Sequence, residues 1–235
     1  MTTHFPNGVS NQTLGNPLYK YPYLDPFKYY TYSNDFFTYH ADEWTITTVE
    51  AGAGSATEGL TSQEGGALLI TNDAADNDSD FFNLKGESFK WNSNKRMFFT
   101  AKFKISDATQ SDFVMGLQIT DTTPLDVTDG IFFIKNDADT TPDFIVEKDN
   151  TASTVEMDAM ADDTFVVLSF EYDPLDVATG GAVFRAYQDN VQVAEITTTD
   201  NAPDDEELTI SFGIQNGEAV AKTMTIDYIF AAVER

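Results

Sequence analysis

The stretch Phe165-Val166-Val167-Leu168-Ser169-Phe170-Glu171-Tyr172 decides the fold class of this chain. Apolar residues recur at every second position in it, so that Leu168 and Phe170 share one face while Ser169 and Glu171 share the other. Because side chains alternate between the two faces of a strand, this pattern predicts a β-strand with one buried face.

Similar segments extend outward from this strand in both directions, and clusters of Gly, Asp, Asn and Pro separate them. They are Trp44–Val49, Ala67–Thr71, Phe81–Leu84, Met97–Ile105, Phe113–Ile119, Ile131–Lys135, Phe144–Glu147, Ala182–Gln188, Val191–Ile196, Leu208–Ile214 and Thr223–Val233. Between two of them, Asp189-Asn190 predicts a tight hairpin turn. So many short strands spaced by turns predict an all-β, two-sheet antiparallel sandwich, with one short helix over Met157–Asp163.

The first part of the chain differs from the rest, because it is rich in proline and tyrosine and carries little charge. Proline disfavours both helix and central strand, so we expect an extended arm over residues 1–35, followed by the sandwich domain over residues 36–235. Tyrosine is enriched at contact surfaces, and two alternatives stay open: the arm packs on its own domain, or it contacts another molecule. The residues predicted to bind a partner are Tyr19, Tyr21, Tyr23, Phe27, Tyr29 and Tyr30.

The charge of the chain limits its partners. Thirteen Lys and Arg residues face 39 Asp and Glu residues, which gives a formal net charge of −26. Such a surface repels nucleic acids and anionic membranes, so we expect the protein to bind neither. The start of the chain does not have the pattern of a secretory signal, and we expect synthesis in a cytoplasm.

Most catalytic constellations are missing from the sequence. It contains no cysteine, and its two histidines are His4 and His40, with no nucleophile elbow or phosphate-binding loop. The strongest enzyme candidate is a glycosidase that uses a carboxylate pair at Glu171 and Asp173, as jelly-roll glucanases do on one strand. Pro174 interrupts that strand pattern, and we therefore predict no catalytic residues and no enzymatic activity.

The sequence also contains three weaker candidates for binding sites. Asp76, Asp78 and Asp80 alternate in an acidic loop and predict at most a weak Ca²⁺ site, with a second candidate at Asp121, Asp126 and Asp129. No other cofactor is expected. Trp91 lies in a polar, locally basic segment with Asn92 and Asn94, and these three residues are candidates for contact with carbohydrate or a partner.

The order of the strand patterns resembles the concanavalin A-like jelly-roll proteins that occur as structural components of tailed phages. The resemblance covers residues 40–233 and depends on strand patterns rather than catalytic signatures. The segments that carry it are Met97–Ser106, Phe113–Gln118, Gly130–Phe133, Leu168–Asp173, Leu208–Gly213 and Ala219–Ile229.

The resemblance implies a virion structural protein, and we expect a capsid decoration protein that attaches to the major capsid protein through its N-terminal arm. It would work in the virion, self-associate on the particle and contact other virion proteins. The alternative is a carbohydrate-binding or receptor-binding module of a phage tail or fibre.

Overall fold

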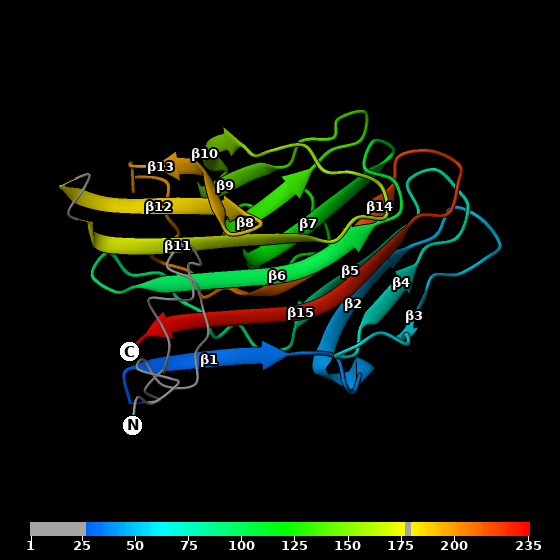
Figure 1. Cartoon of the computed structure of the whole chain (residues 1–235), viewed down its shortest axis with the longest axis horizontal. Helices are drawn as coiled ribbons and strands as arrows, with labels where there is room; N and C mark the ends of the chain where they lie inside the picture. The colour runs from blue at the N-terminus through cyan, green and yellow to red at the C-terminus, as the bar shows by residue number, and fades with distance from the viewer. Residues whose placement is uncertain (1–26, 177–179) are drawn as a thin grey trace, which may run out of the picture.

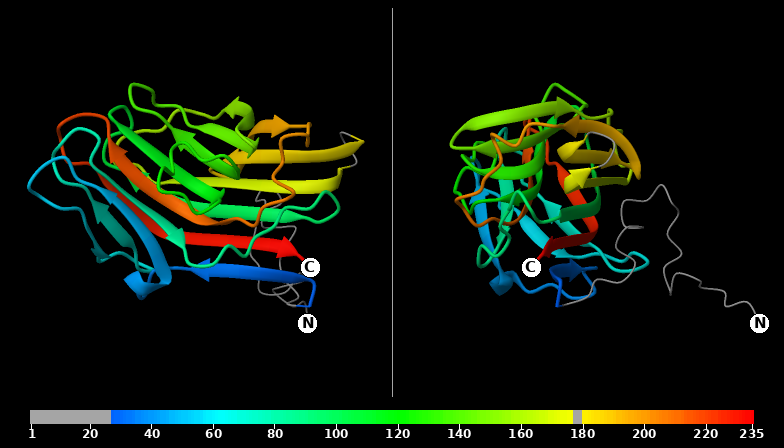
Figure 2. Two further views of the ribbon diagram at one scale, coloured as in Figure 1. Left: turned by 180° about the vertical axis from the view of Figure 1, so that it is seen from behind. Right: turned by 90° about the vertical axis from the view of Figure 1, so that its left-hand side faces the viewer.

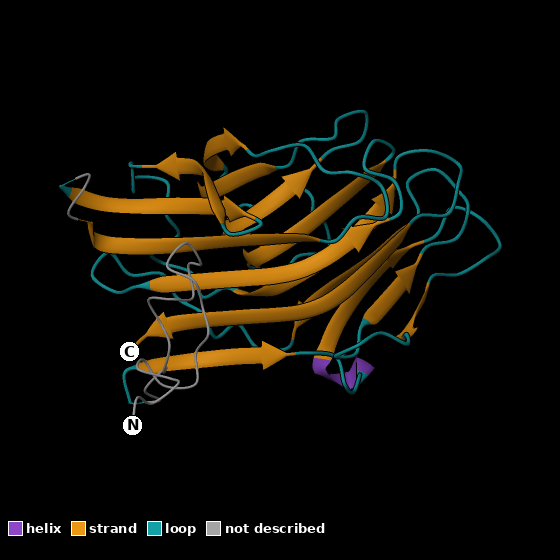
Figure 3. Cartoon of the chain, viewed as in Figure 1, coloured by secondary structure: helices purple, strands orange, loops and turns teal. Residues whose placement is uncertain are grey.

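The computed structural model describes residues 27–176 and 180–235. These residues form two antiparallel sheets, and their one helical element is a turn of 3-10 helix, η2 (Ala41–Glu43) (Figure 3). Within the described residues, no helix has the length and apolar character needed to cross a membrane. The predicted all-β, two-sheet antiparallel sandwich is therefore confirmed.

The two sheets are built from strands that are distant in the sequence (Figure 1). Sheet A has the order β13 (Val191–Ile196), β12 (Gly181–Gln188), β11 (Val166–Asp176), β6 (Met97–Ile105), β15 (Thr223–Glu234), β4 (Leu68–Thr71) and β3 (Thr57–Leu60), with β1 (Tyr29–Asn34) also paired to β15. Sheet B has the order β10 (Thr151–Glu156), β9 (Asp143–Lys148), β8 (Gly130–Lys135), β7 (Ser111–Gln118), β14 (Thr209–Asn216), β5 (Ser79–Leu84) and β2 (Trp44–Val49). Figure 2 shows how the two layers face each other.

The main core lies between the sheets and is strongly aromatic. Phe99 and Phe170 stack across neighbouring strands of sheet A, and Phe82 stacks on Phe212 in sheet B at a centroid distance of 5.0 Å. Trp44 and Phe212 form a T-shaped pair at the same centroid distance. These buried rings are the alternating apolar residues of the sequence pattern, which is why the pattern predicted the sandwich.

A second apolar cluster lies on the outer face of sheet B, away from the main core. Phe81, Val114, Phe132 and Ile134 project from that face, and Val127 of the loop over residues 119–129 packs on them. All five side chains are buried. The loop after β7 therefore covers part of a sheet face that would otherwise meet solvent.

Glycines on this outer face allow the phenylalanine rings to lie flat on the sheet. A Cβ added to Gly213 would lie 2.5 Å from Cδ1 of Phe81, its partner on β5. A Cβ added to Gly116 would lie 2.6 Å from Cβ of Phe132, its partner on β8. Each glycine therefore makes room for the aromatic residue opposite it.

Three local features differ from the sequence prediction. Tyr29–Asn34, assigned to the arm, forms β1 and pairs with β15 of the sandwich. Met157–Asp163 is not helical, and its first residue is held by a backbone hydrogen bond to Pro142. Pro174 does not end its strand, because the register shifts between Asp173 and Asp176 and the bulge accommodates it.

Candidate functional site

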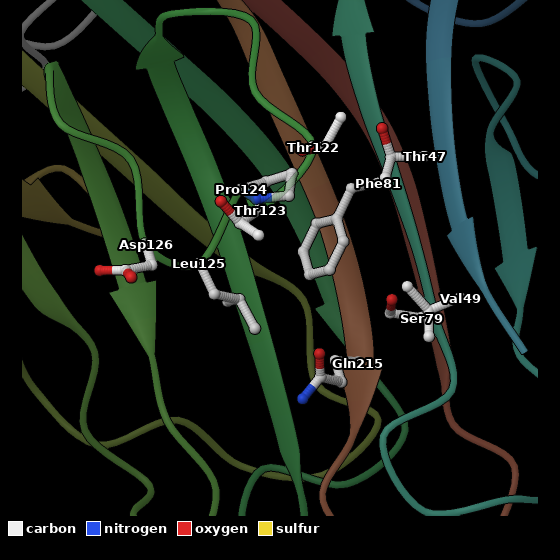
Figure 4. A pocket seen from close by; sticks show the side chains of 10 residues that line it. All are labelled: Thr47, Val49, Ser79, Phe81, Thr122, Thr123, Pro124, Leu125, Asp126 and Gln215. Atoms are coloured by element: carbon white, nitrogen blue, oxygen red, sulfur yellow. The ribbon is translucent and has the colours of Figure 1, made fainter. Parts of the chain in front are cut away.

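A groove of about 250 Å³ opens on the outer face of sheet B, beside the second apolar cluster (Figure 4). Its apolar surface comes from Phe81 of β5, Val49 of β2 and Leu125 of the loop. The other lining residues are Thr47, Ser79, Thr122, Thr123, Pro124, Asp126 and Gln215. An apolar floor with hydroxyl and amide groups around it suits a small ligand that has both an apolar face and hydroxyl groups.

The loop wall of the groove is held in place by its own hydrogen bonds. The side chain of Asp121 accepts hydrogen bonds from the backbone N–H and the hydroxyl of Thr123, both at 2.7 Å. The backbone N–H of Asp126 donates to the carbonyl of Thr123, and the carbonyl of Pro124 accepts from the buried amide of Gln118. With Leu125 and Val127 packed on the sheet, this wall is formed before any ligand binds.

An acidic cluster adjoins the groove at the ends of β2 and β5. Carboxylate oxygens of Glu50, Asp73 and Asp78 all lie within 4.8 Å of one another. Glu50 directly follows Val49 and Asp78 directly precedes Ser79, and these two groove residues are paired between the strands. The cluster therefore lies next to the groove along these two strands, although none of its three residues lines the groove.

Backbone hydrogen bonds and a pair of asparagines fix the cluster. Both carboxylate oxygens of Asp78 accept backbone N–H groups, from Ala51 at 2.6 Å and from Ala75 at 3.0 Å. The buried side chains of Asn72 and Asn216 hydrogen-bond the carbonyls of this loop and each other. The loop therefore presents its carboxylates in a set geometry.

The charge of the cluster is not balanced by the basic side chains of the described chain. No Lys or Arg in those ranges forms an ion pair with Glu50, Asp73 or Asp78, whereas Lys222 nearby pairs with Asp107 and Glu218. The Oε2 atom of Glu50 is buried without a hydrogen-bond partner. Three close carboxylates repel one another, and oxygen ligands of this kind are those that Ca²⁺ prefers.

Other carboxylates make the surroundings of the groove negative. Burial raises the pKa of Glu147, and the nearby Asp126 and Asp129 raise it further. Behind the groove, burial raises the pKa of Asp80 to about 6, with Glu58 adding to the rise and the Thr48 hydroxyl opposing it. A carboxyl group is harder to ionise where several others stand close to it.

The predicted Ca²⁺ residues are only partly brought together. Asp78 belongs to the cluster, but Asp76 is exposed, and Asp80 points to the interior, where it accepts a hydrogen bond from Thr48 at 2.6 Å. In the structure, Asp78 is joined by Glu50 and Asp73 instead of Asp76 and Asp80. In the second candidate, Asp121 and Asp129 are used in hydrogen bonds within the loop and to residues beside it.

Trp91 is buried, contrary to its polar sequence context, with 4% of its surface exposed. Its ring packs on Tyr172 at 5.2 Å and on Phe184 at 6.1 Å. Trp91 and Asn92 do line a polar pocket of about 450 Å³, whereas Asn94 is exposed and hydrogen-bonds Asn92. Little of the tryptophan side chain is therefore available to a ligand.

The carboxylates of the glycosidase hypothesis lie on the other sheet. Glu171 is buried on the outer face of sheet A, where it accepts a hydrogen bond from Tyr187 at 2.6 Å and lies 3.7 Å from Arg185. Asp173 lies 3.5 Å from Arg96. Both acids take part in ion pairs with arginine, and neither lines the groove.

The arm residues divide between described and undescribed parts of the chain. Tyr19, Tyr21 and Tyr23 lie outside the described residues. Phe27 is 89% exposed. Tyr29 and Tyr30 belong to β1, where Tyr30 packs on Phe89 at 5.9 Å and lies 5.6 Å from the Arg235 guanidinium. This end of the predicted arm therefore contacts its own domain.

No protein-family model matches the sequence, and no curated protein matches it either. Among solved structures, the chain is similar to the endo-1,3-β-glucanase of Streptomyces sioyaensis, with a TM-score of 0.61, 10% identity, and coverage of 89% of this chain and 98% of the other. It is similar to a prokaryotic β-1,3-1,4-glucanase (lichenase) from a mouse hindgut metagenome, with a TM-score of 0.59, 12% identity and coverage of 86% and 98%. The potassium-bound Emp46p carbohydrate recognition domain gives a TM-score of 0.56, 14% identity and coverage of 85% and 94%.

These neighbours confirm the concanavalin A-like jelly roll and correct one other expectation. The prediction of no enzymatic activity, made because Pro174 interrupts the carboxylate strand, is contradicted, because two of these three neighbours of the same fold are enzymes. At such low identity the likeness shows the fold alone, so it assigns no activity to this chain. Nothing in the comparisons supports a virion, capsid or phage origin, and the capsid partners and virion location stay predictions.

Proposed function

We propose that the protein binds carbohydrate, with the groove on sheet B holding the sugar and the adjoining acidic cluster holding a cation. The observation that carries the proposal is the composition of the groove: an apolar surface beside a rim of threonine, serine and glutamine side chains. A sugar ring has the same two characters, since its C–H groups form apolar patches and its hydroxyl groups seek hydrogen bonds. The fold is shared with a carbohydrate recognition domain and two glucanases, which agrees with this ligand class.

The preformed wall also supports a binding role. A groove that keeps its shape without ligand loses little entropy when a ligand enters it. Leu125 is held on the sheet by the second apolar cluster, and Thr123 is held by Asp121. The polar groups around the groove are therefore positioned before binding, as selective recognition of hydroxyl groups requires.

A cation in the acidic cluster would stabilise the groove through the chain on either side of it. Glu50 and Asp78 flank Val49 and Ser79, so an ion held by their carboxylates would hold the two groove residues together. One neighbouring carbohydrate recognition domain was solved in a potassium-bound form, and hard oxygen ligands also suit Ca²⁺. The cation would therefore strengthen sugar binding indirectly, by fixing the positions of β2 and β5.

The sugar site is tested with two valines that have comparable exposure. Val49 in the groove is 50% exposed, and Val191 on β13 is 65% exposed. After a glycan array has identified a ligand, its affinity is measured by calorimetry for the wild type, Val49→Gln and Val191→Gln. We expect Val49→Gln to weaken binding about fivefold by removing apolar contact worth about 1 kcal/mol, and Val191→Gln to leave it unchanged. Equal binding by all three proteins would place the sugar elsewhere.

The cation site is tested separately by thermal unfolding with Ca²⁺ or with a chelator. The wild type should melt at a higher temperature in Ca²⁺, because a ligand that binds only the folded state stabilises it. Asp73→Asn should lose this response, and Asp76→Asn, an exposed acid of the same loop, should keep it. An unchanged melting temperature of the wild type in Ca²⁺, and in K⁺ as well, would refute the site.

A further inference from the structure

We infer that the groove accepts one uncharged sugar unit at the end of a glycan, and neither an extended polysaccharide nor a uronic acid. The inference rests on the proposed function and names the class of ligand that the groove selects. Its two parts have separate physical grounds, the extent of the groove and its charge.

The size of the groove sets the length of the ligand. Its volume of about 250 Å³ is below the ~300 Å³ at which sites for drug-sized ligands begin. It is lined by residues of β2, β5, β14 and one loop, which leaves the strands beyond β7 without a part in it. A site of this extent holds about one sugar ring.

The loop over residues 119–129 prevents a longer chain from crossing the sheet. Val114 of β7 and Phe132 of β8 would form the next part of an extended cleft, but both are buried. Val127 and Leu125 of the loop pack on this patch. Figure 4 shows Leu125 and Asp126 standing between the groove and the strands beyond it. A polysaccharide laid across sheet B would meet this wall after one or two units.

The charge of the groove selects against acidic sugars. Asp126 is the one charged residue among its lining residues in the described chain, and no Lys, Arg or His joins it there. Gln215 donates a hydrogen bond to Asp112 at 3.4 Å, which places another carboxylate behind the rim. A uronate carboxylate would be repelled here and would find no basic partner.

The test compares sugars that differ only at one carbon. Ligand-observed NMR titrations use the methyl glycosides of glucose and galactose, and the methyl glycosides of glucuronic and galacturonic acid with their carboxylates free. We expect at least one neutral glycoside to bind at least tenfold more tightly than its matched uronide, and the ratio to narrow in 0.5 M NaCl as the repulsion is screened. A uronide that binds as well as its neutral partner would overturn the charge argument.

The second arm measures chain length. For the neutral sugar that binds best, the disaccharide and the hexasaccharide should bind within about threefold of each other per mole of chain. A hexasaccharide that binds ten times more tightly than the disaccharide would indicate an extended cleft. That result would overturn the inference that the groove accepts only the terminal sugar unit. These failures leave the proposed function standing, because a sugar still binds. If no sugar in either arm binds, or if Val49→Gln leaves every affinity unchanged, the proposed function fails and the inference fails with it.

Discussion

Replacing Asp80 by asparagine should stabilise the protein at pH 7 and leave its stability almost unchanged at pH 3.5. Asp80 is 1% exposed, and its pKa is raised from an ordinary 3.8 to about 6, chiefly by burial. Because the folded state binds the proton more tightly than the unfolded state, this group favours folding most below pH 3.8. That contribution is lost as the pH rises through 6.

The magnitude follows from the size of the shift. A difference of about two pKa units corresponds to about 3 kcal/mol at pH values above both pKa values. Asparagine cannot ionise, and its oxygen can still accept the hydrogen bond from Thr48, so Asp80→Asn removes most of this cost. We therefore expect its free energy of unfolding at pH 7 to exceed that of the wild type by about 2–3 kcal/mol.

The assay is urea unfolding of both proteins in chelator at pH 3.5, 5 and 7. Asp76→Asn is the control, since this exposed residue should change stability by less than about 0.5 kcal/mol at each pH. The reasoning is refuted if Asp80→Asn changes stability equally at all three pH values, or destabilises the protein at pH 7.

Three further substitutions test the fold and the placement of the site on sheet B. Gly213→Ala should lower the free energy of unfolding by at least about 2 kcal/mol, because the added Cβ would lie 2.4 Å from the carbonyl oxygen of Asp80. Urea titration measures this loss. A smaller loss would mean that the two strands can separate to accommodate the methyl group. Glu171→Gln should lower the free energy of unfolding by about 2 kcal/mol, since the buried Arg185 loses one of its acidic neighbours. Its sugar affinity should equal that of the wild type, because Glu171 lies on sheet A. An altered affinity would contradict the placement of the site on sheet B. Asn190→Val should lower the free energy of unfolding by about 1–2 kcal/mol in thermal unfolding, because a β-branched residue would have to adopt a φ of 67°. Asn190→Gly should change stability little. Equal stability of the two variants would argue against the turn geometry.

The central strands could be predicted because they are half-buried and therefore alternate. The Asp189-Asn190 turn could also be predicted, and both residues have the positive φ values that such a hairpin needs. Strands β1, β3 and β10 were not predicted. Each lies at or beside a sheet edge and carries mostly polar residues, so its strand conformation is set by pairing with a neighbour rather than by a buried face.

One feature of the sequence indicated that the outer face of sheet B is partly covered, and simple alternation of apolar and polar residues does not explain it. Phe81-Phe82 and Ile131–Ile134 are continuous apolar runs, and such runs indicate strands buried on both faces. Apolar side chains on the outer face of sheet B must therefore be shielded from water, and the loop over residues 119–129 shields them. Which loop covers them depends on the order of strands in the sheet, and local sequence does not specify that order.

The acidic cluster could not be found by local spacing. Asp73 and Asp78 are close in sequence, but Glu50 reaches them only because β2 pairs with β5. Trp91 was misjudged for a related reason: its neighbours in sequence are polar, whereas its neighbours in space are Tyr172 and Phe184. In both cases the decisive contacts join segments that are far apart along the chain.

The pairing of β1 with β15 determines how the protein would respond to mechanical tension. Tyr29 is opposite Glu234, and the backbone N–H of Arg235 donates to the carbonyl of Lys28, so both strands can be gripped at the same end. Tethers attached at these two points would pull perpendicular to the strands and load one interstrand hydrogen bond at a time. The sandwich would therefore unzip from that end at low force, whereas anchors at opposite ends of the two strands would load the whole ladder in shear and hold longer.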